Sequence, residues 1–122
     1  MWGFQQTTGG VHNPAGTLVG YGYSGNGADL DNPAGQGDRG HGPIPQGMWR
    51  IGEFFDDLGG KGPIVAHLTP VDEADALGRS GFMIHGDNRQ LNHTASDGCI
   101  ILSHDLRAMI AASSDRLLLV SA

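Results

Sequence analysis

The chain has 122 residues, a length that favours one domain spanning residues 1–122. Seven Lys and Arg against thirteen Asp and Glu give a net charge of -6 and no basic stripe, which argues against a nucleic-acid partner. No apolar run is long enough to cross a membrane, and the N-terminus has neither the basic region nor the apolar core of a secretion signal. We therefore expect no membrane insertion and no signal peptide in this chain.

Glycine and proline are both frequent in this chain. The chain carries 21 Gly and six Pro, more than ordinary usage, while 39% apolar residues are enough for a packed core. This balance predicts many turns, little helix and a mostly β fold.

The first expected strands cover residues 1–6 and 17–23. Residues 24–42 have almost no apolar side chains and many turn formers, which predicts a long loop. Because a connection of that length in a compact domain is usually either functional or mobile, we place it at the rim of the functional site and leave mere mobility open.

The rest of the chain supplies shorter elements. Pro43 and Pro45 indicate a fixed turn that feeds a strand containing Met48, Trp49 and Ile51. Further strands are expected over residues 64–69, 81–85, 99–102 and 117–120, with a loop or short helical turn over 70–80. Ser103 is a good N-cap for a helix over residues 105–112.

Cys99 is the only cysteine, so it cannot form a disulfide within the chain. His85 ends one apolar run and Cys99 begins another fourteen positions later, which predicts neighbouring strands that present a nucleophile to a base. Gly86 leaves room beside the imidazole, and Gly98 allows a close backbone approach. The amides of Gly98 and Cys99 are candidate donors to an oxyanion. We therefore predict a cysteine acyl-transfer enzyme in which Cys99, His85, Gly86 and Gly98 form the catalytic set.

The competing interpretation of Cys99 is an inert buried thiol, since free cysteines are among the most buried residues. The polar residues before it favour a position at a strand mouth instead. His93 is a rival base, and His41 in the glycine-rich loop meets either substrate or solvent. No histidine pair has a tight metal-ligand spacing, so we expect no metal and no cofactor.

The chain order, histidine before cysteine, is the reverse of that in papain-like enzymes. It resembles the L,D-transpeptidases of the YkuD type, in which a histidine, a spacer and then Ser/Thr-His-Gly-Cys recur; here the matching residues are His85 and Ser96-Asp97-Gly98-Cys99. Asp97 replaces the usual second histidine, and Ile101 stands where an arginine often follows. With the motifs at residues 42–47 and 81–88, these departures resemble the divergent Tlde1-like branch of type VI secretion effectors with an L,D-transpeptidase domain.

This resemblance implies a YkuD-like β-sandwich core with one or two short helices, and a site that acts on peptidoglycan stem peptides. By the family pattern, Cys99 attacks the carbonyl of the L-centre of diaminopimelate and expels D-alanine, forming a thioester acyl-enzyme. His85 takes the thiol proton and is oriented by the carbonyl of Gly86, while Ser96 and Asp97 shape the pocket. Water, a free D-amino acid or a neighbouring diaminopimelate amine would resolve the acyl-enzyme, so carboxypeptidase, exchange and cross-linking activities stay open.

The resemblance also implies an antibacterial toxin delivered to the periplasm of a target cell, with an immunity protein as a compatible partner. The alternative from another class is a non-catalytic cell-wall-binding module of the same fold. An activated thiol would react with iodoacetamide well below about pH 8, whereas an inert buried one would not.

Several polar residues near the motifs are candidates for substrate contacts. Asp87 and Asn88 either bind polar ends of the stem peptide or form a turn. Arg79 is the candidate for a substrate carboxylate that lies nearest the histidine strand, with Arg39 and Arg89 as the other available cations. Asp97 either stabilises a histidinium or is solvated.

Overall fold

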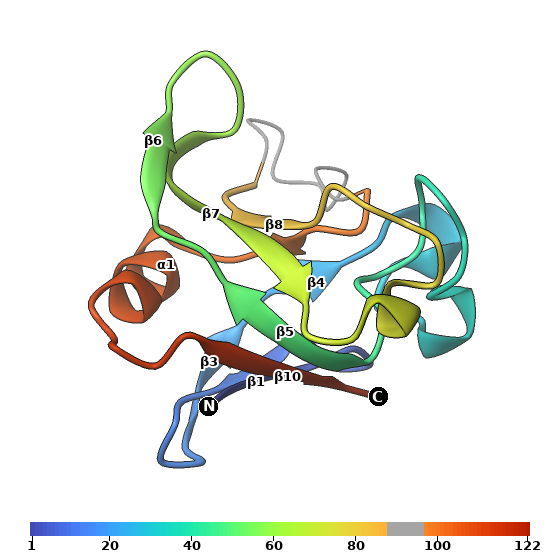
Figure 1. The fold of residues 1–122 in the computed structure, drawn as a ribbon, viewed down its shortest axis with the longest axis horizontal. Coiled ribbons are helices and arrows are strands. Elements are labelled where there is room, and N and C mark those ends of the chain that lie inside the picture. Colours follow the sequence, from blue (N-terminus) through green and yellow to red (C-terminus); the bar gives the residue numbers. More distant parts are fainter. Residues whose placement is uncertain (88–96) are drawn as a thin grey trace.

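The computed structural model of the chain describes residues 1–87 and 97–122. The described residues form a mostly β structure (Figure 1). Its strands are β1 (Trp2–Gln5), β2 (Gly10–His12), β3 (Leu18–Tyr21), β4 (Tyr23–Ser24), β5 (Gly47–Ile51), β6 (Phe55–Asp57), β7 (Gly62–Pro70), β8 (Met83–His85), β9 (Ile100–Ile101) and β10 (Leu117–Ser121). Three 3-10 turns, η1 (Gly27–Asp29), η2 (Pro33–Gly35) and η3 (Glu73–Ala76), and the helix α1 (His104–Ala111) complete it.

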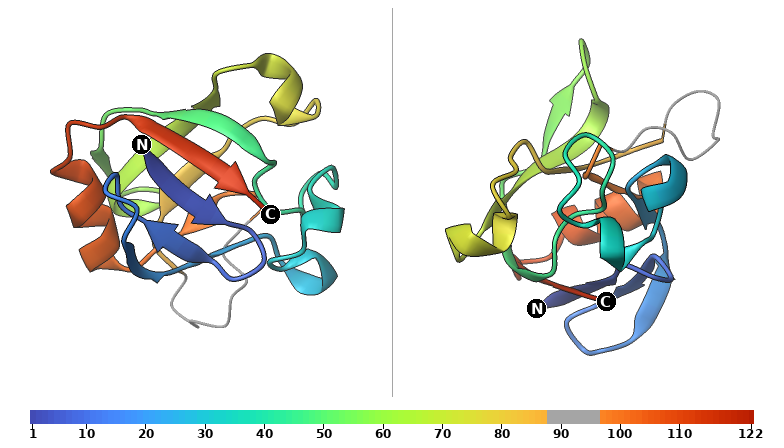
Figure 2. Two further views of the ribbon diagram at one scale, coloured as in Figure 1. Left: turned by 90° about the horizontal axis from the view of Figure 1, so that it is seen from below. Right: turned by 90° about the vertical axis from the view of Figure 1, so that its right-hand side faces the viewer.

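The strands join into a sheet that almost closes on itself (Figure 2). Its order is β3-β2-β1-β10-β5-β7-β8-β9-β4, with β6 paired to β7 as a projecting hairpin. The two strands at the ends of this order, β3 and β4, follow each other in the chain and are separated only by Gly22. The sheet therefore curls until its two edges are connected by one residue.

Gly22 makes this connection possible because it lacks a side chain. A Cβ there would clash with the carbonyl oxygen of Ile101 and with a methyl group of Leu102. The amide of Gly22 donates to the carbonyl of Gly9 at 2.8 Å, which ties the connection to the start of β2. The close approach explains why glycine stands at this position.

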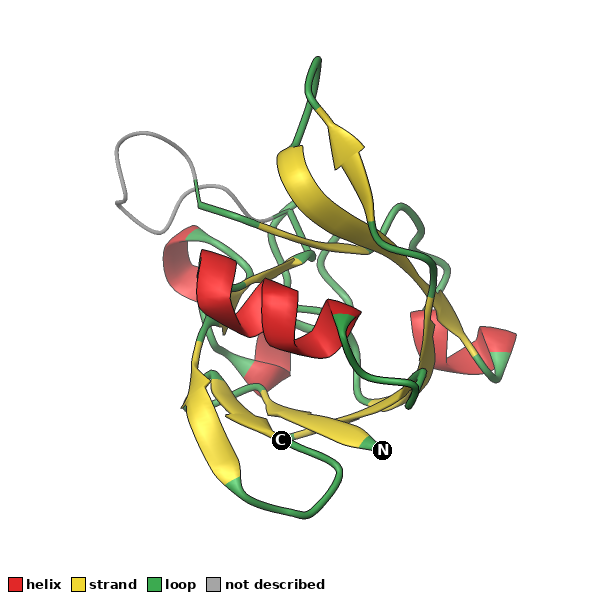
Figure 3. Ribbon diagram, turned by 90° about the vertical axis from the view of Figure 1, so that its left-hand side faces the viewer, coloured by secondary structure: helices red, strands yellow, loops and turns green. Residues whose placement is uncertain are grey.

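The main hydrophobic core fills the inside of the curled sheet, with α1 lying across it (Figure 3). Trp49 is fully buried, donates from Nε1 to the carbonyl of Pro45 at 3.0 Å, and meets Phe82 edge to face at 4.9 Å between ring centroids. Leu106 and Ile110 of α1 reach the same core. A second, smaller cluster lies on the other face of β8 and β9 and consists of Tyr23, Val65, Met83, Cys99 and Ile101.

The mostly β expectation is confirmed, and the expected helix is present as α1. Ser103 caps it, since its side chain accepts from the amide of Leu106 at 3.2 Å. The strands β2 and β6 were not expected: each has three residues and an irregular register with its partner strand, which erases the alternation that marks a strand in sequence. The expected loop over residues 24–42 contains η1 and η2, so part of it is a succession of short helical turns.

Among the described residues, no helix is long and apolar enough to cross a membrane.

Candidate active site

Cys99 and His85 lie on the same face of two adjacent parallel strands. In the β8–β9 pair, Ile84 is opposite Ile100 and His85 is opposite Ile101. Side chains alternate along a strand, so His85 shares a face with Ile101, and Cys99, two residues before Ile101, shares it too. The packing agrees, because Cys99 belongs to the cluster that contains Met83 and Ile101 rather than to the main core. The predicted neighbouring strands are therefore present.

His85 is held in one ring orientation. Its Nδ1 lies 2.8 Å from the carbonyl oxygen of Gly86, so a neutral imidazole must carry its proton on Nδ1 to make this hydrogen bond. The lone pair then lies on Nε2, which is buried and has no hydrogen-bond partner among the described residues. Burial lowers the pKa of His85, and the hydrogen bond to Gly86 only partly opposes this effect. The imidazole is thus neutral near pH 7, with its basic nitrogen unused.

Cys99 is a buried thiol with backbone neighbours. Its Sγ lies 3.8 Å from the carbonyl oxygen of Gly81. Burial raises the pKa of Cys99, while the backbone of Met83 and the positive charge of Lys61 act in the opposite direction with smaller effect. In this environment the thiol stays protonated at neutral pH. A base must take its proton for the sulfur to attack.

The backbone before Cys99 is fixed from the side of β4. The hydroxyl of Ser24 donates to the carbonyl of Cys99 at 2.9 Å and accepts from the amide of Ile44 at 2.8 Å. Gly98 has a φ of 118°, which side chains rarely adopt, and a Cβ there would crowd Phe82 at 3.0 Å. These contacts set the direction in which the Gly98 and Cys99 amides point.

Arg79 joins the glycine-rich loop to the segment before Cys99. Its guanidinium donates to the carbonyls of Gln36, Gly42, Pro43 and Asp97, and it lies over the ring of Phe82 at 5.1 Å. Arg79 is buried, and burial lowers its pKa. Its terminal N–H groups are therefore used by backbone carbonyls, in place of the substrate carboxylate suggested by the sequence. The loop over residues 24–42 lies next to the Cys99 segment, where we expected it.

Asp97 is exposed and accepts a hydrogen bond from the side-chain amide of Asn26 at 3.2 Å. Its charge is one of the causes that raise the pKa of Cys99. The charges that act on His85 are those of Lys61, Arg107 and Asp87, so the interpretation of Asp97 as a partner of a histidinium finds no support in these contacts.

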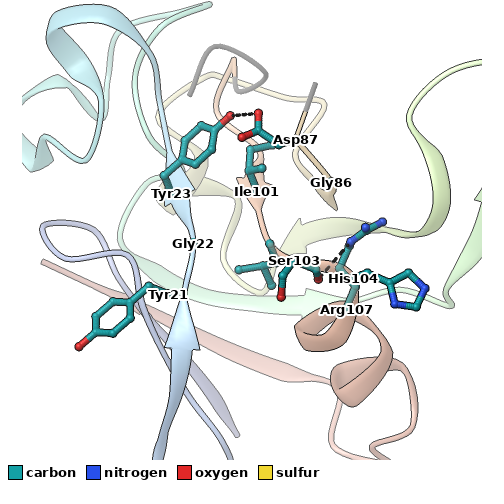
Figure 4. A pocket seen from close by; sticks show the side chains of 10 residues that line it. Tyr21, Gly22, Tyr23, Gly86, Asp87, Ile101, Ser103, His104 and Arg107 are labelled. Carbon is teal, nitrogen blue, oxygen red and sulfur yellow. Dashed lines mark hydrogen bonds between the residues drawn. The ribbon is translucent and has the colours of Figure 1, made fainter. Parts of the chain in front are cut away.

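A pocket of about 540 Å³ lies at Gly86 and Asp87, the two residues that follow His85 (Figure 4). Its walls include Tyr23, Gly86, Asp87, Ile101, Ser103 and Arg107. The hydroxyl of Tyr23 donates to Oδ1 of Asp87 at 2.7 Å, which places this candidate binding residue at the pocket wall. Tyr23 and Ile101 also belong to the cluster around Cys99, so the pocket and the thiol share two neighbours.

Arg107 is a residue that the sequence reasoning missed. It lies in α1 next to the apolar stripe of Leu106 and Ile110, and it is buried although it is charged. The expected helix already contained this position, and the helical period would have placed Arg107 beside the buried stripe. The packing of α1 brings Arg107 to Gly86.

Four residues singled out from the sequence lie outside the described residues: Asn88, Arg89, His93 and Ser96. Of the other candidates, His41 is exposed and its Nδ1 lies 3.1 Å from Oδ1 of Asn26. Within residues 1–87 and 97–122, no three His, Cys, Asp or Glu side chains are grouped so as to hold a metal ion.

The described residues thus form a curled, mostly β fold in which a buried histidine ends β8 and a buried cysteine directly precedes the adjacent parallel strand β9. The family model of the Tlde1 domain matches residues 19–118, and the chain therefore belongs to the Tlde1 domain family of type VI secretion effectors. Membership of this family implies delivery into target cells. No curated protein matches the chain.

Proposed function

We propose that the chain is a cysteine-dependent peptidoglycan L,D-transpeptidase or L,D-carboxypeptidase that acts on the diaminopimelate-D-alanine bond of tetrapeptide stems. The observation that carries the proposal is the placement of Cys99 and His85 on one sheet face, where the Gly86 carbonyl leaves Nε2 of His85 as the basic nitrogen. Membership of the effector family implies delivery into target cells, and the proposed site of action is the cell wall in the periplasm of a bacterial target.

The first half of the reaction starts from a protonated Cys99 thiol and a neutral His85 imidazole. Sγ of Cys99 attacks the carbonyl carbon of the L-centre of diaminopimelate as Nε2 of His85 takes the thiol proton. The amides of Gly98 and Cys99 are the proposed donors to the oxyanion. The intermediate collapses with cleavage of the C–N bond, and the proton on His85 passes to the leaving amine of D-alanine. A thioester on Cys99 and free D-alanine result.

The second half regenerates the thiol. A nucleophile attacks the thioester carbonyl, gives a proton to His85, and displaces the sulfur, which recovers a proton from the imidazolium. Water yields the tripeptide and a carboxypeptidase reaction, a D-amino acid yields exchange, and the amine of a second diaminopimelate yields a cross-link. Each route restores the protein with Cys99 protonated and His85 neutral.

The test incubates diaminopimelate tetrapeptide muropeptides with the wild type, Cys99→Ala and His85→Gln, and follows products by mass spectrometry. We expect D-alanine release only with the wild type and a loss of at least about 10³-fold in either variant. His67→Gln is the matched control, because His67 is an exposed histidine on the neighbouring β7. Equal product profiles for the wild type and Cys99→Ala would rule out the proposal.

A non-catalytic wall-binding module is the second candidate, and the burial of Cys99, which raises the pKa of its thiol, is the observation that favours it. Such a module would bind muropeptides without turnover and would bind them equally well as Cys99→Ala. The proposed partners in both cases are peptidoglycan stem peptides, and for a toxin also an immunity protein in the producing cell.

A further inference from the structure

The pocket at Gly86 and Asp87 is lined by a buried cation, Arg107, that has a donor without a hydrogen bond among the described residues. Arg107 is 8% exposed. Its Nη1 donates to the carbonyls of Pro63 and Ile64, and its Nε donates to the carbonyl of Ser103 at 3.3 Å. No hydrogen bond within the described residues uses Nη2. This nitrogen lies against the backbone of Gly86, since a Cβ on Gly86 would come within 2.9 Å of it.

Arg107 also has no carboxylate partner among the described residues, where the ion pairs are those of the N-terminus with Asp115 and of His104 with Asp105. Burying a charge without a counter-charge is costly, and burial indeed lowers the pKa of Arg107. A guanidinium in this state favours a ligand that brings a carboxylate, because the N–H donors then gain charge-assisted hydrogen bonds. The pocket offers the space for such a ligand.

A carboxylate of the protein itself also lines the pocket. Asp87 lines it together with Tyr23, whose hydroxyl fixes one carboxylate oxygen of Asp87 (Figure 4). A ligand with only negative groups would be repelled by Asp87, and a ligand with only positive groups would be repelled by Arg107. Because the pocket is lined by the negative Asp87 and the positive Arg107, it favours a ligand that carries both an ammonium and a carboxylate.

We propose that this pocket binds a zwitterionic amino-acid head group, with its carboxylate on Arg107 and its ammonium on Asp87. On the proposed function, this group is the D-centre of diaminopimelate, which three methylene groups separate from the L-centre where the reaction takes place. The pocket suits that arrangement, because Gly86 follows the proposed base and Ile101 lies two residues after the proposed nucleophile. A free amino acid carries the same head group and is the other source of this chemistry.

Binding tests the proposal without turnover. The probes are free meso-diaminopimelate, its diamide in which both carboxylates are amidated, glycine and D-alanine, titrated calorimetrically into the Cys99→Ala protein. We expect meso-diaminopimelate to bind, and we expect Arg107→Met, Asp87→Asn and amidation of the probe each to weaken binding at least about tenfold. Arg50→Met removes the same charge from an exposed position on β5 and should bind like the parent protein.

Titrations with glycine and D-alanine distinguish the two sources of the head group, a free amino acid and the stem peptide. Binding of these small probes with the same dependence on Arg107 identifies a pocket for a free amino acid, whereas binding of meso-diaminopimelate alone identifies a pocket for the side chain of the stem peptide. Both results support the head-group proposal. Absence of binding by all zwitterionic probes, or equal binding of meso-diaminopimelate and its diamide, overturns it.

Arg107 also holds three backbone carbonyls, so loss of the fold must be separated from loss of the ligand. Thermal unfolding of each variant provides this check, and Arg107→Lys, which keeps the charge, should retain more binding than Arg107→Met. If Arg107→Met does not fold, the comparison of meso-diaminopimelate with its diamide decides the question on the parent protein. The proposed function fails separately, by the absence of D-alanine release that depends on Cys99, and the binding result stands regardless of that outcome.

Discussion

His85 and Cys99 leave the parallel β8–β9 pair on the same face, with Ile101 beside the histidine and Met83 beside the cysteine. The opposite face of the same two strands carries Ile84 and Ile100, which belong to the main core. The core therefore fixes the register that brings the histidine and the cysteine together. A slip by one residue in either strand would turn one of the two side chains into the interior.

Alkylation of Cys99 should have a pH midpoint above the ordinary value for a thiol, which is about 8.5. Burial raises the pKa of this thiol, and the positive charge of Lys61 does not offset it. The measurement is the rate of iodoacetamide labelling against pH, with mass spectrometry to locate the label. Asp97→Asn should move the midpoint down, because the charge of Asp97 is one of the causes that raise it. A midpoint well below pH 8 in the free protein would show that the thiol is activated before substrate binds.

The free energy of unfolding should fall as the pH drops below about 6.5. Burial lowers the pKa of His85 in the folded chain, so the unfolded chain takes up this proton at a higher pH. Protonation then favours unfolding, and the stability present above the unfolded pKa is lost as the pH falls. Urea denaturation at pH 7.5 and pH 5 measures the change. His85→Gln should flatten the dependence, whereas His67→Gln, which alters an exposed ring stacked on Phe55, should leave it as steep as in the wild type.

Gly22→Ala should destabilise the fold by about 1–3 kcal/mol or more. The added methyl group meets the carbonyl of Ile101, which is backbone of β9 and cannot rotate away. Gly37→Ala is the control, because a Cβ there meets nothing within 4 Å and its φ is not in the left-handed region. Thermal unfolding compares the two. Equal stability of both variants would mean that the connection between β3 and β4 is more tolerant than its geometry indicates.

Some elements of the fold could be predicted from the sequence, and others could not. Strands with apolar bulk, such as Gly47–Ile51 and Leu117–Ser121, and the capped helix after Ser103 were predictable, because periodicity and capping are local properties. The near closure of the sheet was not, since it depends on the approach of Gly22 to Ile101, two residues 79 positions apart.

The residues of the candidate site were likewise predictable only where local sequence signals mark them. His85 and Cys99 could be found from the sequence because their spacing and flanking apolar runs imply adjacent strands. The contact of Arg107 with Gly86 could not, because it depends on where α1 packs. The role of Arg79 was open for a related reason: its charge is visible in the sequence, but the carbonyls that surround it come from a loop about forty residues away.

Arg79→Lys should lower the free energy of unfolding by about 1–3 kcal/mol, because one ammonium cannot reach all the carbonyls that the guanidinium serves and leaves some of them unpaired. Arg39→Lys is the matched control, since Arg39 is exposed and, within residues 1–87 and 97–122, donates only to the carbonyl of Gly78; we expect a change within about 0.5 kcal/mol. Urea denaturation of both variants gives the two values, and muropeptide kinetics on the same samples give KM. A variant Arg79→Lys that keeps wild-type stability and raises only KM would contradict the structural role and restore Arg79 as a contact for a substrate carboxylate. These contacts predict that Arg79→Lys loses stability while the KM of its folded fraction is unchanged, because the guanidinium directs its donors at the protein.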